Sequence, residues 1–116
     1  MNFDFSKQEQ IVFFTTGRKQ EWVKASDIMY IMVDLTLSFA YVNYREEAYI
    51  FNKQLTEFIA ELAHCGFIRA NKNTLVNLKF SKSVDRVGKG HVIIMKSDKK
   101  ITLSRRQYSV VRKFAK

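Results

Sequence analysis

The side chains that commonly carry catalysis or bind metals are few in this sequence. Its single cysteine, Cys65, follows His64 directly, and adjacent residues of a helix point about 100° apart, so the two cannot form a nucleophile–base pair. His91 has no partner at the spacing that a metal site requires. Residues 88–90, Gly-Lys-Gly, resemble a phosphate-binding loop, but no helix is expected to start after them, and a hairpin turn fits better. The sequence therefore predicts that the protein is not an enzyme and holds neither a metal ion nor a cofactor.

Positive charge is the stronger chemical signal, and it is concentrated in the second half of the chain. The net charge is +9 at pH 7. Residues 1–66 contain six Lys and Arg against nine Asp and Glu, whereas residues 67–116 contain 14 against two, so the two parts carry net charges of −3 and +12. Such clustering indicates a positive face and a polyanionic partner. A solvated basic surface that serves only solubility is the alternative.

These charged residues fall on a pattern of short strands. Apolar residues alternate with polar ones, or form short apolar runs between polar turns, as strands require. The run 28–33 is apolar enough and long enough to be buried on both faces of a sheet. The expected strands cover residues 11–15, 22–24, 28–33, 39–43, 47–51, 67–69, 75–78, 80–87, 91–96 and 100–103.

Only one helix is strongly indicated. Apolar residues recur at i, i+3, i+4 and i+7, with a candidate N-cap at Asn52 and a candidate left-handed residue after the helix at Gly66. Since its outer side is polar and acidic, we expect this helix to pack on a sheet and not to enter a DNA groove. A short helix or ordered turn is expected near the C-terminus, where Tyr108, Val111 and Phe114 are spaced by three. The apolar stripe of the main helix consists of Leu55, Phe58, Ile59 and Leu62.

The chain is expected to form one mostly β domain. It has 116 residues, no proline and no linker-like segment, so we place an N-terminal extension at residues 1–10 and one domain at residues 11–116. No apolar stretch approaches the roughly 20 residues of a membrane-spanning helix, and residues 1–10 lack the apolar core of a signal peptide. We therefore expect a cytoplasmic protein that does not contact a membrane.

Four separated features, in the right order, resemble the LytTR family of bacterial DNA-binding domains. Residues 27–31 (DIMYI) look like the family's opening strand, and the helix over residues 55–62 lies where the family has one. Residues 67–78 (FIRANKNTLVNL) are similar to a family phrase that runs phenylalanine, any residue, arginine, any residue, histidine, arginine, serine, two variable positions, valine, asparagine. Residues 102–106 (TLSRR) match the family's serine–arginine pair at the end of the last strand. The resemblance spans residues 11–114.

Together with the pattern above, the resemblance implies a mostly β fold of stacked antiparallel sheets, with about eight to ten short strands, one main helix and a short C-terminal helix or turn. It implies binding of double-stranded DNA through loops. LytTR domains usually follow a phosphorylatable receiver in response regulators of bacterial two-component systems, and they activate or repress transcription at promoter direct repeats. This sequence has no room for a receiver. The resemblance thus implies a stand-alone regulator, or part of one whose receiver domain or sensor partner lies outside this chain. Because one small domain buries too little surface for tight and specific binding, we expect two copies on paired half-sites, as a homodimer on DNA.

The same resemblance points to DNA-facing residues in three places: after the opening strand, in the polar turn after the main helix, and at the end of the last strand. Arginine offers a planar fork for O6 and N7 of guanine, and asparagine can pair with N6 and N7 of adenine. Lysine cannot fork, so it contacts phosphate or a single base atom, and less discrimination is expected where it replaces the family's arginine. The residues are Thr36, Ser38, Asn71, Lys72, Asn73, Arg105 and Arg106.

Two further positions and two other functions stay open. Asn77 matches the family's asparagine but is expected to hold the turn's backbone, and Arg69 fits either a DNA contact or an ion pair with a helix glutamate. A module that binds RNA or single strands would stack bases on exposed aromatics among basic residues. A protein-interaction module would set the basic face against an acidic partner and would bind no nucleic acid. The candidate stacking residues are Phe67, Phe80, Tyr108 and Phe114, although their spacing favours the core.

Overall fold

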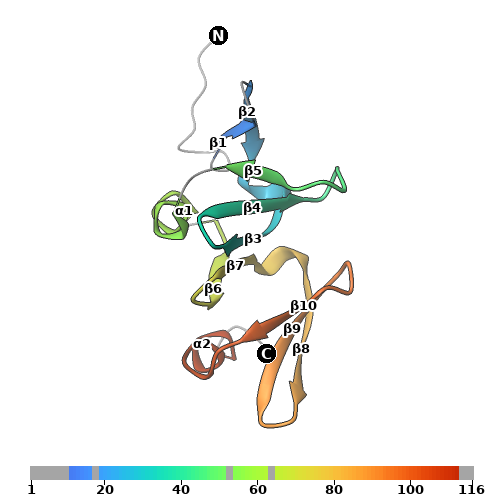
Figure 1. Cartoon of the computed structure of the whole chain (residues 1–116). Coiled ribbons are helices and arrows are strands. Elements are labelled where there is room, and N and C mark those ends of the chain that lie inside the picture. Colours follow the sequence, from blue (N-terminus) through green and yellow to red (C-terminus); the bar gives the residue numbers. More distant parts are fainter. Residues whose placement is uncertain (1–10, 17–18, 52–53, 63–64, 113–116) are drawn as a thin grey trace.

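The computed structural model arranges the chain in two packed antiparallel sheets, a β-hairpin and two helices, as the sequence predicts (Figure 1). The expected extension at residues 1–10, the Asn52 cap, His64 and Phe114 lie outside the described residues. No described helix is long and apolar enough to cross a membrane. The structure describes residues 11–16, 19–51, 54–62 and 65–112.

The described strands number ten, at the upper end of the expected range. The larger sheet has the order β5-β4-β3-β7-β6, the smaller sheet has the order β10-β9-β8, and β1 pairs with β2. The fifth strand begins at Tyr49 and not at residue 47, where Glu47 instead pairs with Arg45 at 3.7 Å in the preceding loop. The elements are β1 (Ile11–Thr16), β2 (Lys19–Lys24), β3 (Ile28–Asp34), β4 (Leu37–Val42), β5 (Tyr49–Phe51), α1 (Leu55–Leu62), β6 (Phe67–Asn71), β7 (Thr74–Asn77), β8 (Ser81–Val87), β9 (Gly90–Met95), β10 (Lys100–Leu103) and α2 (Arg105–Val111).

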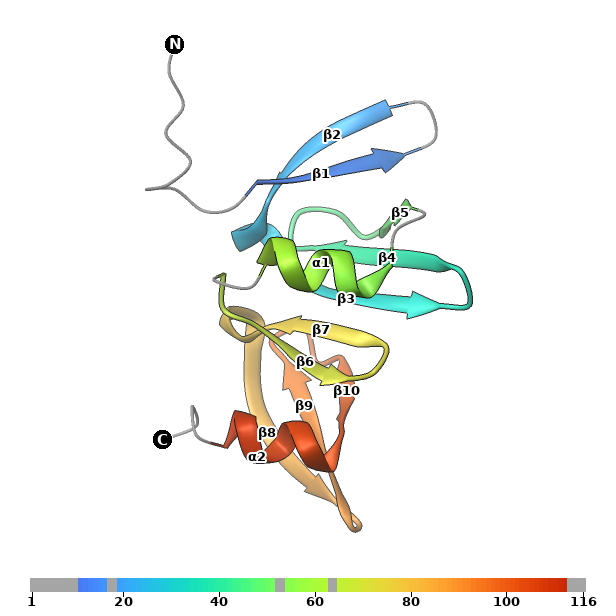
Figure 2. The same cartoon turned by 90° about the vertical axis from the view of Figure 1, so that its left-hand side faces the viewer.

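Strand β3 lies at the centre of the fold, because both of its faces are buried, as its apolar run predicts. On one face Ile28 and Ile31 pack in a core with Phe58 of α1, and all three side chains are fully buried. On the other face Tyr30 joins a second core with Ile93 of the smaller sheet. An irregularity in the β3–β4 pairing between Ile28 and Tyr30 lets Ile28 and Ile31, three residues apart, share a face. The larger sheet is therefore covered by α1 on one side and by the smaller sheet on the other (Figure 2).

The short C-terminal helix, α2, begins directly after the last strand, as expected. Strand β10 ends at Leu103, and the Ser104 Oγ accepts a hydrogen bond from the Gln107 N–H at 3.3 Å, which makes Ser104 the N-cap of α2. Arg105 and Arg106 form the first turn of this helix. The Ser104 N–H also donates to the Ala70 carbonyl at 2.9 Å, so the start of α2 is fixed beside β6.

Asn77 holds backbone groups inside the protein, as predicted, and its side chain is 2% exposed. Its Nδ2 donates to the carbonyl oxygens of Ile28 at 3.0 Å and Ala25 at 3.5 Å. Its Oδ1 accepts from the Lys79 N–H at 3.1 Å. One side chain thus joins the entry to β3 with the end of β7. Gly66, with φ of +81°, adopts the left-handed conformation expected of it after the main helix.

The substitution Asn77→Ala should lower the free energy of unfolding by about 2–4 kcal/mol, because it leaves buried backbone donors and acceptors without partners. Urea denaturation followed by circular dichroism measures this change. Asn43→Ala, which removes the same amide from an exposed turn, should change the stability by less than about 0.5 kcal/mol. A loss of unfolding free energy in Asn77→Ala no larger than that in Asn43→Ala would show that the Asn77 hydrogen bonds contribute nothing to stability.

Candidate nucleic-acid interface

Residues from distant parts of the chain line one groove between the two sheets. The groove has a volume of about 500 Å³ and lies between the end of β3, the β6–β7 turn and the start of β10. Its polar lining contains two amides and two exposed lysines, together with the carboxylate of Asp34. The amides are those of Asn71 and Asn73, and the lysines are Lys99 and Lys100.

The β6–β7 turn at the edge of this groove is held rigidly by its own residues. The Asn71 Oδ1 accepts from the Asn73 N–H at 2.9 Å, and the Asn71 Nδ2 donates to the Thr102 carbonyl at 2.7 Å. Arg69 donates to the carbonyls of Asn71 at 3.3 Å and Lys72 at 2.7 Å. These contacts give Arg69 a role that neither expectation named: its guanidinium donates to backbone carbonyls and stabilises the turn.

Asn71 has a structural role beside the base contact expected of it. Its amide nitrogen and its amide oxygen each make one hydrogen bond within the protein, which fixes the orientation of the side chain in the turn. The side chains of Lys72 and Asn73, by contrast, are exposed at the tip of the turn. The Asn73 carbonyl accepts from the Val33 N–H at 2.9 Å, which joins this turn to the end of β3.

Two of the three predicted clusters are brought together by β10. The Asn71–Thr102 bond attaches the β6–β7 turn to β10, and the Ser104–Ala70 bond attaches the start of α2 to β6. Exposed Arg105 then follows within three residues of Thr102. In Figure 2 the β3–β4 turn, the β6–β7 turn and the first turn of α2 all lie toward the same side of the molecule. We call these three elements, with the groove between them, the turn face.

The two residues of the third predicted cluster, Thr36 and Ser38, differ in their exposure to solvent. Thr36 is exposed in the β3–β4 turn, whereas Ser38 is in β4 and is 0% exposed. The expectation that Ser38 contacts DNA is wrong for this structure, because successive strand residues point to opposite faces and Ser38 points into the protein.

Leu35, which the sequence analysis did not single out, forms the tip of the β3–β4 turn. Its side chain is 93% exposed, and its φ of +56° is a left-handed conformation that costs a leucine about 1–2 kcal/mol. An apolar side chain held at this position can contact the methyl group of thymine. The expected strands left residues 34–38 between them, so the sequence pattern gave no signal for the two-residue turn over residues 35–36 that the β3–β4 register requires.

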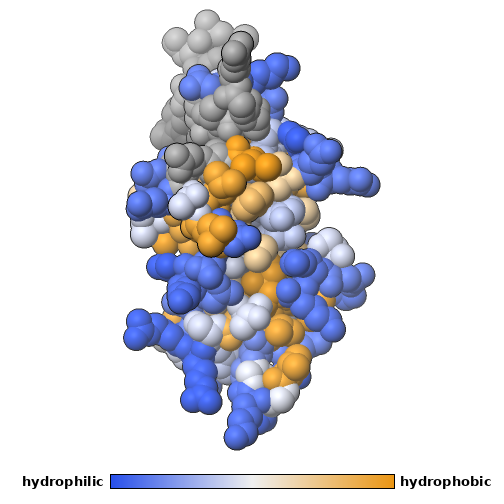
Figure 3. Space-filling model, in the orientation of Figure 1, coloured by the Kyte–Doolittle hydropathy of each residue, from blue (hydrophilic) through white to orange (hydrophobic). Residues whose placement is uncertain are grey.

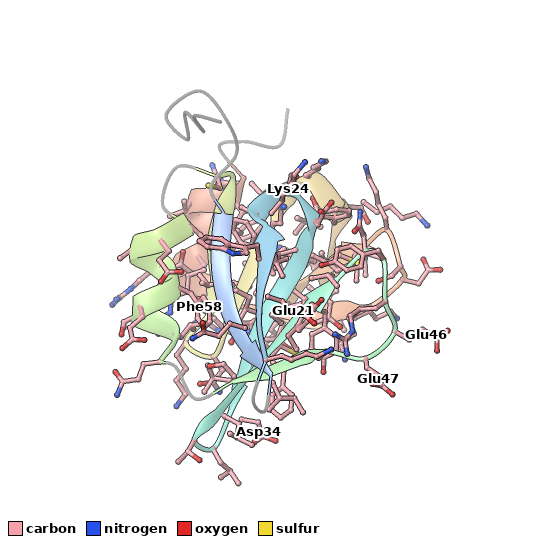
Figure 4. All side chains as sticks on the ribbon, turned by 90° about the horizontal axis from the view of Figure 1, so that it is seen from above. Glu21, Lys24, Asp34, Glu46, Glu47 and Phe58 are labelled. Carbon is pink, nitrogen blue, oxygen red and sulfur yellow. The ribbon has the colours of Figure 1, made fainter. Side chains whose placement is uncertain are left out.

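Charge is separated in space as it is in sequence. The smaller sheet, α2 and the β6–β7 turn carry exposed cations, and of the two acids there Asp98 is paired with Lys82 at 3.4 Å. Hydrophilic side chains gather over this lower half on both sides of a narrower apolar strip (Figure 3). The acids labelled in Figure 4 lie elsewhere: Glu21 is on β2, and Glu46 and Glu47 are on the loop between β4 and β5. The exposed cations of the lower half are Lys72, Lys79, Lys82, Arg86, Lys89, Lys96, Lys99, Lys100, Arg105, Arg106 and Arg112.

The described aromatic candidates for stacking are partly buried and pack against the two cores. Phe67 packs against the core under α1, while Phe80 and Tyr108 pack against the core between the sheets. Among the described residues, no group of His, Cys, Asp and Glu could hold a metal ion. What the turn face offers chemically is amide, ammonium and guanidinium donors, which suit base edges and phosphates.

Asn71→Asp should lower the free energy of unfolding by about 1–3 kcal/mol, because the new carboxylate oxygen would face the Thr102 carbonyl where an N–H now donates. Asn73→Asp, the same change at an exposed side chain two residues away, should lower it by less than about 0.5 kcal/mol. Urea denaturation of both variants tests this difference. A stability loss that is larger in Asn73→Asp would contradict the positioning role of Asn71.

Comparison with known proteins agrees with this geometry. The LytTr DNA-binding domain family matches residues 18–116. The LytTr DNA-binding domain of a putative methyl-accepting/DNA response regulator from Bacillus cereus has the same fold, with a TM-score of 0.77 over 92% of this chain and 97% of that chain at 19% identity. No curated protein matches the sequence. The family match covers the larger sheet, the smaller sheet and the whole turn face, and the chain therefore belongs to the LytTR family of DNA-binding domains.

Proposed function

We propose that the protein is a sequence-specific transcriptional regulator that binds duplex DNA through the turn face. One observation carries the proposal: a rigid turn presents Lys72 and Asn73 beside the arginine-bearing start of α2, around a groove lined by lysines. Rigid positioning matters because a base contact contributes specificity only when its geometry is fixed before binding. Membership of a DNA-binding family supports the choice of DNA among polyanions.

The residues of the turn face divide into base readers, phosphate contacts and positioning residues. Arg105 and Arg106 are the candidates for guanine, and Asn73 is the candidate for adenine. Lys72 and Lys99 contact phosphate or single base atoms. The tip of the β3–β4 turn, Leu35 and Thr36, adds apolar and hydroxyl contacts. Asn71 and Arg69 position the β6–β7 turn and do not themselves read bases.

Two copies on repeated half-sites fit the size of the domain. One small module buries too little surface for tight and specific binding, so a second copy on the same promoter raises both affinity and specificity. We place the domain in a bacterial two-component response regulator acting in the cytoplasm, with a receiver or sensor outside this chain. The proposal assigns no enzymatic activity to the domain.

Selection from a random duplex library tests the proposal directly. We expect enrichment of a short motif that is repeated on one strand. Fluorescence titration should then show that the selected duplex binds more tightly than scrambled and single-stranded controls. Equal binding to every duplex would reduce the function to non-specific attachment. Equal or tighter binding to single strands would replace it with the single-strand module, and no binding at all would favour a protein partner.

Arg106→Ala should weaken binding to the selected duplex by about 1–3 kcal/mol and relax preference at one base position, because it removes a bidentate guanine contact. Arg45→Ala is the matched control, since it removes the same charge from the loop between β4 and β5, where Arg45 pairs with Glu47. We expect that variant to bind within a few tenths of a kcal/mol of the unaltered protein. Titration of cognate and scrambled duplexes measures both, and an unchanged preference in Arg106→Ala would contradict the assignment.

Binding should also weaken steeply with salt. If about six to eight phosphates are neutralised, the logarithm of the association constant should fall against the logarithm of salt concentration with a slope of about −5 to −7. Titrations of the selected duplex between about 50 and 200 mM salt give this slope. A slope near zero would show that the basic half does not meet the phosphate backbone.

A further inference from the structure

A second cleft, separate from the turn face, lies between the smaller sheet and α2. Its volume is about 420 Å³, within the range of small-molecule sites. Strands β8 and β9 form one wall and the C-terminal half of α2 forms the other, so residues distant in sequence enclose it. We call it the arginine cleft. It is lined by Val84, Arg86, His91, Tyr108, Val111 and Arg112.

The floor of the arginine cleft is apolar and aromatic. The rings of His91 and Tyr108 are stacked, with centroids 3.6 Å apart and planes 11° from parallel. Val111 beside them is only 3% exposed, and Val84 is half-buried. This stack joins β9 to α2 and gives the cleft a flat, fixed surface on which a planar group can lie.

Two exposed guanidinium groups flank this floor from opposite walls. Arg86 comes from β8 and Arg112 from the end of α2. Among the described residues, the ion pairs join Arg45 to Glu47 and Lys82 to Asp98, and neither arginine of the cleft takes part in one. The Arg86 Nε donates only a long hydrogen bond, 3.4 Å, to the Gly88 carbonyl. Two cations over an apolar floor, neither in an ion pair with a described carboxylate, favour an anionic ligand.

The arginine cleft does not share its lining with the turn face. Arg106 and Arg112 are six residues apart on α2, which separates them by about 9 Å along the helix axis. In Figure 2 the first turn of α2 lies toward the turn face, and the opposite end of the helix points away from it. The groove of the turn face and the arginine cleft have no lining residue in common.

We propose that the arginine cleft binds a small aromatic carboxylate. A guanidinium matches the two oxygens of a carboxylate in a planar fork, and the two cleft arginines can hold the group from both walls. The stacked rings and the two valines then cover the apolar body of the ligand, which an inorganic anion lacks. The cleft thus selects for a charge and an apolar ring in one molecule.

The test uses 2-naphthoate as the probe and follows the ¹H–¹⁵N NMR spectrum of the chain. We expect shifts centred on residues 84–91 and 108–112, with a dissociation constant of about 1 mM or tighter. The neutral isostere 2-naphthamide and inorganic phosphate should each bind at least about tenfold more weakly, because one lacks the charge and the other lacks the ring. Naphthoate should also raise the melting temperature, since it binds only the folded state.

Three variants distinguish bidentate binding of the carboxylate by arginine from attraction by positive charge alone. Arg86→Gln and Arg112→Gln should each weaken naphthoate binding about tenfold, and Arg86→Lys should restore only part of the loss, because lysine cannot fork. Arg105→Gln, the same change at the other end of α2, should leave naphthoate binding unchanged. The dispersion of each spectrum shows whether the variant is folded, and the shift map of the unaltered protein tests the site independently of any variant.

Three results would overturn the proposal. Equal affinities for naphthoate, naphthamide and phosphate would show that the cleft is a non-selective surface. Shifts centred on the groove that contains Asn73 and Lys99 would place the ligand on the turn face. An equal loss in Arg105→Gln and the two cleft variants would show that only the net charge matters.

Discussion

The burial of strand β3 on both faces is the constraint on which the rest of the structure depends. A strand with apolar side chains on both sides needs a cover above and below, and α1 and the smaller sheet supply the two covers. Covering the lower face brings β10 against β6, and this contact creates the Asn71–Thr102 and Ser104–Ala70 hydrogen bonds. The turn face is therefore a consequence of core packing, since no local sequence feature could join these residues.

Asn71 and Asn73, which are separated by one residue, have different roles in the turn face. Asn71 uses its amide nitrogen and its amide oxygen for one protein hydrogen bond each and fixes the turn. Asn73 bonds through its backbone N–H and carbonyl and leaves its side chain exposed. A turn stabilised in this way loses little conformational entropy on binding, and that saving strengthens each base contact. Arg69 acts in the same sense by holding the Lys72 carbonyl.

The sequence was sufficient for what depends on local pattern. Strand positions, the main helix and the role of Asn77 follow from alternation, helical spacing and the polar character of a buried turn. It was insufficient where one residue of register decides the outcome. Ser38 lies one strand position from the exposed Leu37, and the two-residue turn over residues 35–36 sets the register that turns Ser38 inward. The bond from Asn71 to Thr102 spans 31 residues and belongs to tertiary structure alone, whereas the Ser104 cap was readable and places the two arginines on a helix.

In the proposed recognition of DNA, the separation of charge acts together with the rigid turns. The acids on β2 and on the β4–β5 loop, Glu21, Glu46 and Glu47, are repelled by a polyanion, while the basic half is attracted, so the domain approaches with one orientation. Attraction of this kind is independent of base sequence and raises the encounter rate with any duplex. In the proposed function, discrimination between DNA sequences comes from the few side chains that the turns hold in place. A protein of this size can separate the two tasks because its cations are spread over the lower half, whereas its candidate base readers sit only where β6, β10 and α2 meet.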